Sequence, residues 1–203
     1  NNQFALDKIE KVKSLEKIII NQQPHILGIV EASNKVKDHQ YFIDNTGLAD
    51  LDYMVGKSSH KRGKQDLVVY YREPFEIVSI DDDINYYDEW IEDIDNDGIK
   101  EVCNFERKPM EVIFRIKGSN INFLVILVAT KSKGVFSIND IINHQYLALA
   151  NRKKILAQSK KIRSRVNQLM DEKPDLPLIV MGDFNDEPGI DSYEKMLGAS
   201  SIE

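Results

Sequence analysis

The sequence is poor in cysteine and has no long apolar run. Cys103 is the only cysteine among 203 residues, which excludes an internal disulfide and a cysteine-rich zinc site. No apolar stretch approaches the roughly 20 residues that a membrane span requires, and no signal-peptide pattern opens the chain. We therefore expect no membrane span and favour a cytoplasmic location, although the N-terminus looks cut.

Positive charge is also scarce. Lysine and arginine number 27 against 33 aspartates and glutamates, which gives a net charge of −6. This balance argues against a general electrostatic nucleic-acid binder, because such proteins neutralise many phosphates with basic side chains. It leaves room for an enzyme that meets phosphates through a local basic patch and a bound cation. The length suits one domain over residues 1–203, and we expect a monomer.

The spacing of apolar residues predicts a mixture of helices and strands. Helices are expected at residues 4–20, 138–172 and 191–197. Strands are expected at residues 25–31, 66–71, 75–80, 110–117, 121–130 and 178–181. The runs at 123–128 and 178–181 are continuously apolar, as in strands that are buried. Residues 32–59 are expected to be mixed and rich in loops.

Two pairs of predicted strands are joined by short turns. Residues 66–71 are expected to pair with 75–80, and 110–117 with 121–130. Because no helix separates the strands of either pair, a parallel doubly wound sheet is the weaker alternative. The pattern favours a layered sandwich of two sheets with helices packed outside.

A polar segment follows the last predicted strand. Gly182 ends the strand, and Asp183 and Asn185 follow it directly. Burying a carboxylate or an amide without a partner costs several kcal/mol, so these groups need a reason to be there. One interpretation is a site for a metal ion and a phosphate. The other is an Asx turn, in which both side chains only cap their own loop and the next helix.

An acidic stretch near the middle of the chain resembles the start of a calcium-binding loop. Asp93, Asp95 and Asp97 alternate, and Gly98 follows where such a loop turns sharply. The twelfth position is Asn104, where the EF-hand pattern requires a bidentate glutamate. We interpret the stretch as an acidic surface insertion and keep Ca²⁺ at the three aspartates as the alternative.

Taken in order, these features resemble the endonuclease/exonuclease/phosphatase superfamily, which includes the deoxyribonuclease-I-like enzymes. The matching segments are residues 24–31, 62–72, 107–109, 131–134, 151–158 and 181–185. The resemblance implies an α/β (α+β) fold, a four-layer α/β/β/α sandwich of two mixed sheets. The sandwich is expected to be incomplete at both edges, because the family's first strand and its last strand, with an Asp-His pair, find no match here.

The same resemblance implies roles for particular residues. Glu31 corresponds to the metal ligand and would hold Mg²⁺ or Mn²⁺. Asp183 corresponds to the group that orients or deprotonates the attacking water, and Asn185 would bind the phosphate or fix that aspartate. The residues expected to contact substrate are Arg107, Lys131 and Asp66. For Glu31 and Asp66 the structural alternatives are a solvated strand end and a capped strand start.

The expected function is metal-dependent hydrolysis of phosphodiester bonds, with DNA as the substrate of an endonuclease or exonuclease. A second enzyme hypothesis keeps this chemistry and replaces DNA with a phosphoinositide, sphingomyelin or another small phosphoester. A third hypothesis is an inactive binding module. Such a module would bind nucleic acid or a protein partner, and it is favoured by Ala129, which stands where one branch of the family has a histidine, and by the acidic insertion.

Overall fold

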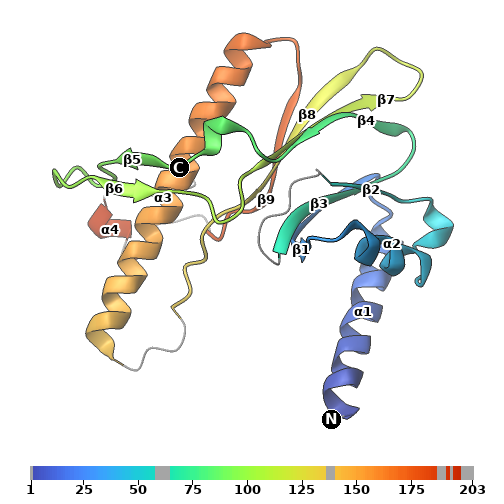
Figure 1. Ribbon diagram of the computed structural model, residues 1–203, viewed down its shortest axis with the longest axis horizontal. Helices are drawn as coiled ribbons and strands as arrows, with labels where there is room; N and C mark the ends of the chain where they lie inside the picture. Colours follow the sequence, from blue (N-terminus) through green and yellow to red (C-terminus); the bar gives the residue numbers. More distant parts are fainter. Residues whose placement is uncertain (1, 58–64, 136–139, 187–190, 193, 198–203) are drawn as a thin grey trace.

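The computed structural model describes the chain except residues 1, 58–64, 136–139, 187–190, 193 and 198–203 (Figure 1). The helices are α1 (Asn2–Gln22), α2 (Val36–Asp44), η1 (Ala49–Leu51), η2 (Asn85–Tyr87), α3 (Ile141–Glu172) and α4 (Glu194–Leu197). The strands are β1 (Ile26–Ser33), β2 (Met54–Gly56), β3 (Gln65–Tyr71), β4 (Phe75–Asp81), β5 (Trp90–Glu92), β6 (Glu101–Cys103), β7 (Met110–Ile116), β8 (Asn122–Ala129) and β9 (Leu178–Asp183). No described helix has the length and apolar character needed to cross a membrane.

The strands form two main sheets and one small sheet. Three strands in the order β1-β3-β2 make an antiparallel sheet. Four strands in the order β4-β7-β8-β9 make a mixed sheet, in which only β8 and β9 run parallel. This parallel pair is possible because the long helix α3 carries the chain back between the two strands. Strands β5 and β6 pair separately beside α3 (Figure 1).

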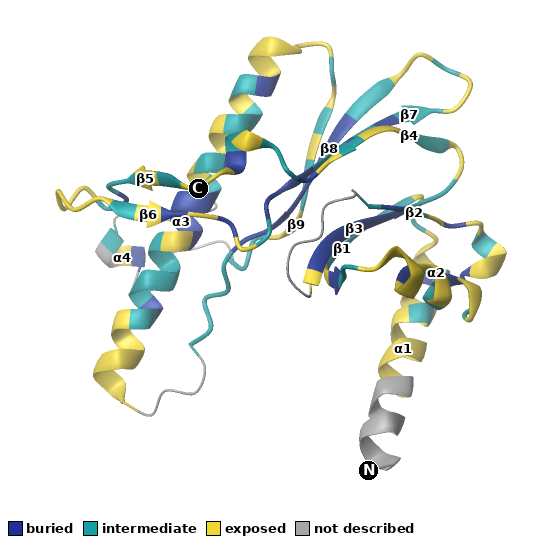
Figure 2. Ribbon diagram, in the orientation of Figure 1, coloured by how far each residue is buried: buried dark blue, intermediate teal, exposed yellow. Residues whose placement is uncertain are grey.

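Three apolar cores separate four layers, as Figure 2 illustrates. Between the two main sheets, Val69 of β3 packs in one cluster with Leu127 of β8. On the far side of the smaller sheet, Val68 packs in a cluster that includes residues of α1 and α2. On the far side of the larger sheet, Ile126 packs against Ile162 of α3. Alternate residues of a strand point to opposite faces, which explains why neighbours serve different cores. The predicted α/β/β/α sandwich is therefore confirmed, and of its two sheets the larger is mixed.

The predicted pairing of residues 66–71 with 75–80 is wrong. Strand β4 pairs with β7 in the larger sheet, whereas β3 lies in the smaller one. Both edges of β3 are already taken by β1 and β2, so β3 has no edge left for β4. The other predicted pair is confirmed, because β7 and β8 form an antiparallel hairpin with Gly118 at its turn.

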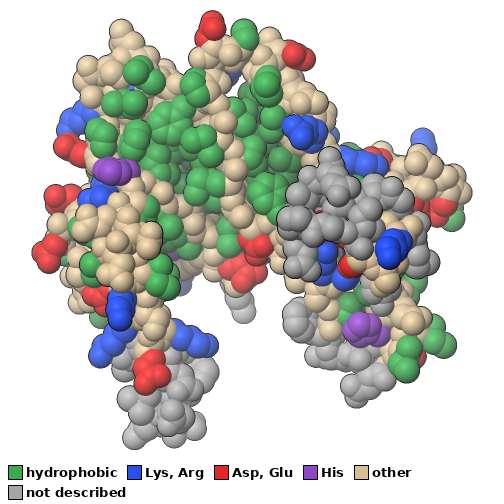
Figure 3. Space-filling model, turned by 180° about the vertical axis from the view of Figure 1, so that it is seen from behind, with side chains coloured by type: hydrophobic (Ala, Val, Ile, Leu, Met, Phe, Trp, Pro, Cys, Tyr) green, Lys and Arg blue, Asp and Glu red, His purple; other side chains and the backbone are tan. Residues whose placement is uncertain are grey.

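Two further sequence predictions need correction. Strand β9 is only half-buried, and Ile179 is 49% exposed, because among the described residues β9 pairs with β8 alone. Seen from behind, hydrophobic side chains gather over the middle of the molecule (Figure 3).

The stretch predicted as loop-rich contains helix α2, which begins after Lys35 without a side-chain cap and so lacks the usual start signal. The helix predicted at 138–172 is α3, and residues 138 and 139 lie outside the described part.

The close approach of β8 to β9 requires a glycine at position 182. The φ angle of Gly182 is +138°, a conformation that L side chains rarely adopt. A Cβ atom at this position would lie 2.0 Å from the carbonyl oxygen of Val128, which is a backbone atom and cannot rotate away. Any side chain at 182 therefore pushes the two strands apart.

We expect Gly182→Ala to lower the free energy of unfolding by more than about 3 kcal/mol, since backbone strain and a backbone clash add together. The matched control is Gly118→Ala, whose φ is +77° with open space around the new methyl group. That variant should lose only about 1–2 kcal/mol, from strain alone. Urea unfolding of both variants measures the difference, and equal losses would contradict the steric argument.

Candidate functional site

Glu31 lies at the end of β1 and contacts a cation from the other sheet. Its Oε1 accepts a long hydrogen bond of 3.4 Å from Nη2 of Arg107, just before β7. Nη1 of Arg107 donates to the side-chain oxygen of Gln65 at 3.3 Å, at the start of β3. The Glu31 side chain is 60% exposed. A carboxylate of the smaller sheet and a guanidinium from the segment that leads into the larger sheet therefore meet.

A second contact connects this point to the end of β8. Glu106 precedes Arg107, and its Oε1 accepts a hydrogen bond of 2.8 Å from Nζ of Lys131. The Lys131 ammonium holds the pKa of the Glu106 carboxyl below its usual value. Thr130 precedes Lys131, and its backbone N–H donates to the carbonyl oxygen of Asp183 at 2.9 Å. Through these contacts Glu31, Arg107, Lys131 and Asp183 gather at one end of the sandwich.

The segment after β9 is a tight turn. The backbone N–H of Asn185 donates to Oδ1 of Asp183 at 2.9 Å, and the φ angle of Asn185 is +50°. The Asn185 amide donates to the carbonyl oxygen of Thr130 at 3.0 Å. The first contact is that of the Asx-turn interpretation, whereas the second ties the turn to the end of β8 and goes beyond it. They leave Asp183 exposed, so the turn fixes the aspartate and does not bury it.

Asp66 has a different environment from the other predicted site residues. It is 6% exposed and forms a buried ion pair with Lys57, while its Oδ1 accepts from the backbone N–H of Leu67 at 3.0 Å. A buried charge needs such a partner, because an unpaired one is costly. This placement agrees with the structural alternative, a capped strand start. We leave Asp66 out of the proposed site.

Ala129 lies directly beside Asp183, because the two residues are paired in the parallel register of β8 and β9. Its side chain is 6% exposed and belongs to the core between the sheets. A methyl group there can neither bind a phosphate nor move a proton. The neighbour of Asp183 on β8 therefore contributes packing alone.

Gln158 of α3 forms hydrogen bonds to the backbones of two loops, at Lys131 and at Asn104. The residue is 3% exposed, its Oε1 accepts from the backbone N–H of Lys131 at 2.7 Å, and its Nε2 donates to the carbonyl of Asn104 at 2.9 Å. Sequence analysis gave Gln158 no role of its own. The available signal was its position on the same helical face as Ile155 and Ile162, where a polar residue needs buried partners.

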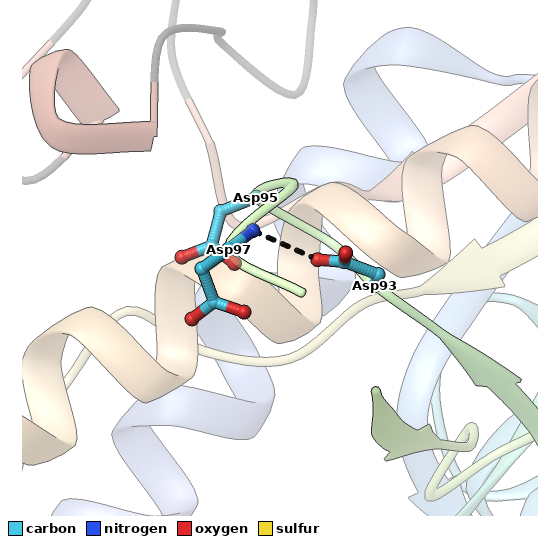
Figure 4. Close-up of side chains that lie close together, drawn as sticks. All are labelled: Asp93, Asp95 and Asp97. Atoms are coloured by element: carbon cyan, nitrogen blue, oxygen red, sulfur yellow. Dashed lines mark hydrogen bonds between the residues drawn. The ribbon is translucent and has the colours of Figure 1, made fainter. Parts of the chain in front are cut away.

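The acidic stretch after β5 gathers three carboxylates that could hold a metal ion (Figure 4). Oxygen atoms of Asp93, Asp95 and Asp97 lie within 4.8 Å of one another. The ammonium of Lys153 on α3 lies 2.8 Å from Asp95 and 2.6 Å from Glu101. Burial disfavours the charged form of Lys153, but these hydrogen bonds outweigh it and raise the pKa of Lys153, while that of Asp95 is lowered. A lysine therefore offsets part of the negative charge of this acidic cluster.

Two sheets packed between helices, with carboxylates and cations where their strands end, define a deoxyribonuclease-I-like α/β/β/α sandwich. Comparison with known families agrees, because the Endonuclease/Exonuclease/phosphatase family matches residues 2–203. The chain belongs to this family, whose members are in general hydrolases of phosphate esters. The resemblance noted in the sequence is thereby confirmed. No curated protein matches the chain.

Solved structures with the same fold are distant in sequence. The catalytic domain of human Nocturnin, with bound sulfate, is 17% identical with a TM-score of 0.53, over 95% of this chain and 63% of that one. Truncated TDP2 of Caenorhabditis elegans is 15% identical with a TM-score of 0.52, over 88% and 56%. A mannosyl-6-phosphatase of Bacteroides thetaiotaomicron is 14% identical with a TM-score of 0.55, over 93% and 61%. The chain thus spans less than two thirds of each of these structures, and the similarity establishes the fold alone.

The contact between Glu106 and Lys131 predicts a pKa change that NMR can measure. In Lys131→Met the pKa of Glu106 should rise toward its usual value, because the hydrogen bond that lowers it is lost. Since the folded-state pKa is lowered, this contact stabilises the fold above the usual glutamate pKa and is lost as the pH falls. Carboxyl carbon titration measures the change. The control Lys153→Met should raise the pKa of Asp95 instead, and an unmoved Glu106 in Lys131→Met would refute the contact.

Neutralisation of the acidic stretch by Lys153 predicts weak calcium binding. We expect calorimetry of the unmodified protein to show a Kd for Ca²⁺ weaker than about 1 mM. Lys153→Met should bind at least about tenfold more tightly, because a positive charge beside the oxygen ligands is removed. The control is Lys154→Met, which removes the same charge from the exposed neighbouring position. Equal affinities in the two variants would show that Lys153 does not compete with the ion.

Proposed function

We propose that this protein is a metal-dependent phosphodiesterase with DNA as its preferred substrate. The proposal is carried by two observations at one end of the sandwich: the exposed carboxylate of Glu31 contacts Arg107, and a backbone bond from Thr130 places the exposed Asp183 beside the segment that carries Lys131. Hydrolysis of a phosphodiester needs negative charge to be neutralised, a water to be oriented and the leaving oxygen to be assisted. The four groups are of the kinds that supply the first two.

Glu31 is the residue that would hold the metal ion. Magnesium keeps several waters and is commonly bound by only one or two carboxylates together with substrate phosphates. An exposed carboxylate whose contact with Arg107 is long, at 3.4 Å, fits that requirement, and oxygen ligands fit Mg²⁺ or Mn²⁺. When bound, the ion would supply charge neutralisation at the phosphate.

Asp183 would orient the attacking water or accept its proton. Its Oδ1 is fixed by the backbone N–H of Asn185, and its backbone carbonyl is fixed by Thr130. A fixed carboxylate loses little freedom when the reaction begins, which is the advantage of positioning. Asn185, which is bonded to Thr130 through its own amide, would maintain this turn beside the phosphate.

Arg107 and Lys131 would contact the phosphate oxygens. Each is now matched with a glutamate, Arg107 with Glu31 and Lys131 with Glu106. Both glutamates are 60% exposed, so these pairs are weakly held and a more highly charged anion can compete for the cations. Arginine in particular suits phosphate because its planar group can donate two parallel hydrogen bonds.

A small phosphoester is the second candidate substrate. The net charge of −6 favours it, because a long polyanion would be repelled at a distance whereas a sugar phosphate or lipid headgroup carries little charge. A mannosyl-6-phosphatase among the structures with this fold shows that such chemistry occurs on the fold. Ala129 beside Asp183 favours a third outcome, binding without turnover.

Plasmid nicking with Mg²⁺ tests the proposal directly. We expect the unmodified chain to nick DNA, EDTA to stop the reaction, and Asp183→Asn and Glu31→Gln each to lower the rate by about 100-fold or more. The matched control is Asp175→Asn, an exposed carboxylate just before the other end of β9, which should nick at the normal rate.

Each other result points to one alternative. Release of phosphate from sugar or inositol phosphates without nicking favours the small-phosphoester enzyme. DNA binding without nicking, converted to nicking by Ala129→His, identifies Ala129 as the cause of inactivity. Nicking that survives both Asp183→Asn and Glu31→Gln would refute the proposed site.

A further inference from the structure

Glu31 has a backbone conformation that other contacts must maintain. Its φ angle is +56°, which is unfavourable for a residue with a side chain, and the pairing of β1 with β3 shifts between Ile29 and Ala32. Such a bulge turns one side chain out of the regular ladder, and this conformation costs roughly 1–3 kcal/mol that the surroundings must offset. What holds the chain just after the bulge therefore decides where the Glu31 carboxylate points.

His39 of α2 holds that segment. Its Nε2 lies 2.7 Å from the carbonyl oxygen of Ser33, two residues after Glu31, and its Nδ1 lies 2.8 Å from the hydroxyl of Tyr70. His39 is 6% exposed, and its ring packs edge to face against the ring of Tyr70. The imidazole therefore joins α2, the end of β1 and the central strand β3.

The chemistry of the partners fixes the tautomer. A carbonyl oxygen only accepts, so Nε2 carries the hydrogen and donates to Ser33. Nδ1 then accepts from the hydroxyl of Tyr70, and burial raises the pKa of Tyr70 to about 12, which keeps that hydroxyl protonated. Both ring nitrogens are thus bonded, and the bond to Ser33 has a fixed direction.

A second contact of Ser33, between its hydroxyl and Asp38, is weaker than the bond from His39. The Ser33 hydroxyl donates to Oδ2 of Asp38 at 2.6 Å, but this pair lies at the exposed surface. Water competes for an exposed hydrogen bond, whereas the histidine bond is shielded by the core around Ile43 and Tyr70. Of these two side-chain contacts the buried imidazole is therefore the stronger, and it adds to the pairing of Ala32 and Ser33 with β3.

We infer that His39 is a positioning residue for Glu31: its Nε2–H bond to Ser33 fixes the bulge and so aims the Glu31 carboxylate at the proposed metal position. The inference rests on the proposed function, because only there does Glu31 bind an ion. Helix α2 has no described residue in the proposed site, and the inference gives it a role in metal affinity.

Two amide variants separate the two bonds of the imidazole. The side-chain amide of His39→Gln reaches the position of Nε2 and can donate to Ser33, whereas that of His39→Asn reaches only the position of Nδ1 near Tyr70. Both place a neutral amide in the same buried space, so they disturb the core to a similar degree. A third variant, Ile43→Val, loosens α2 at a residue that is 2% exposed and packs in the same apolar cluster as Tyr70.

The experiment measures Mn²⁺ affinity by electron paramagnetic resonance and amide hydrogen exchange of residues 29–33 by mass spectrometry. We expect His39→Asn to bind Mn²⁺ roughly tenfold or more weakly, as partners of metal ligands commonly do, and to exchange faster in this segment. His39→Gln should bind Mn²⁺ within threefold of the unmodified protein, and Ile43→Val should do the same. Rescue by glutamine but not asparagine is a result that general loss of packing would not produce.

Glu31→Gln makes the two proposals separable. If Mn²⁺ binding is lost in Glu31→Gln but unchanged in His39→Asn, the positioning role is refuted and the proposed metal site stands. If Glu31→Gln binds Mn²⁺ as well as the unmodified protein, the metal role of Glu31 fails, and with it any role of His39 in metal affinity. Exchange at 29–33 that is equal in His39→Asn and His39→Gln would overturn the restraint itself.

Discussion

The parallel pairing of β8 with β9 is the constraint on which the rest of the candidate site depends. It requires a residue without a Cβ atom at 182, because the carbonyl of Val128 occupies that space. Once the strands meet, their ladder continues beyond their ends: the Thr130 N–H reaches Asp183, and the Asn185 amide reaches Thr130. Beyond the end of β9, the side-chain amide of Asn185 thus donates the hydrogen bond that a backbone N–H would donate within the sheet. Asp183 is held by two bonds: its Oδ1 accepts from the backbone N–H of Asn185, and its backbone carbonyl accepts from Thr130.

The charges of the molecule are used mainly to hold its parts together. Helix α3 carries many lysines and arginines, yet Lys153 binds the acidic stretch and Arg165 makes two hydrogen bonds, of 2.8 and 3.0 Å, to Glu111 of β7. Lys161 lies over the ring of Tyr86. These contacts explain how a basic helix is accommodated in an acidic protein. In the proposed site, the cations that would contact a phosphate are those at the sheet ends, where each neighbouring glutamate is exposed and could be displaced.

The sequence indicated which segments form strands better than it indicated which strands pair. The apolar run at 123–128 is β8, and its alternate residues face the two cores as a strand buried on both faces requires. An alternating or continuous apolar pattern predicts whether one or both faces of a strand are buried, but it does not predict which strand pairs with it. The assignment of β4 depended on β2, a strand of three residues within the stretch predicted as loop-rich. Because β2 fills the second edge of β3, the chain has to cross to the other sheet after Tyr71.

The same asymmetry holds at the candidate site. Glu31, Arg107, Lys131 and Asp183 could be named from the sequence because they lie in segments that resemble the motifs of a known family. The groups that position them could not, because His39, Gln158 and Lys57 bind partners that no local pattern reveals: a carbonyl of Ser33, two loop backbones and a buried aspartate. A buried polar side chain is stable only when such partners are present, and they are brought together by the fold. Candidate site residues can therefore be proposed from the sequence, whereas the contacts that hold them in position become visible only in three dimensions.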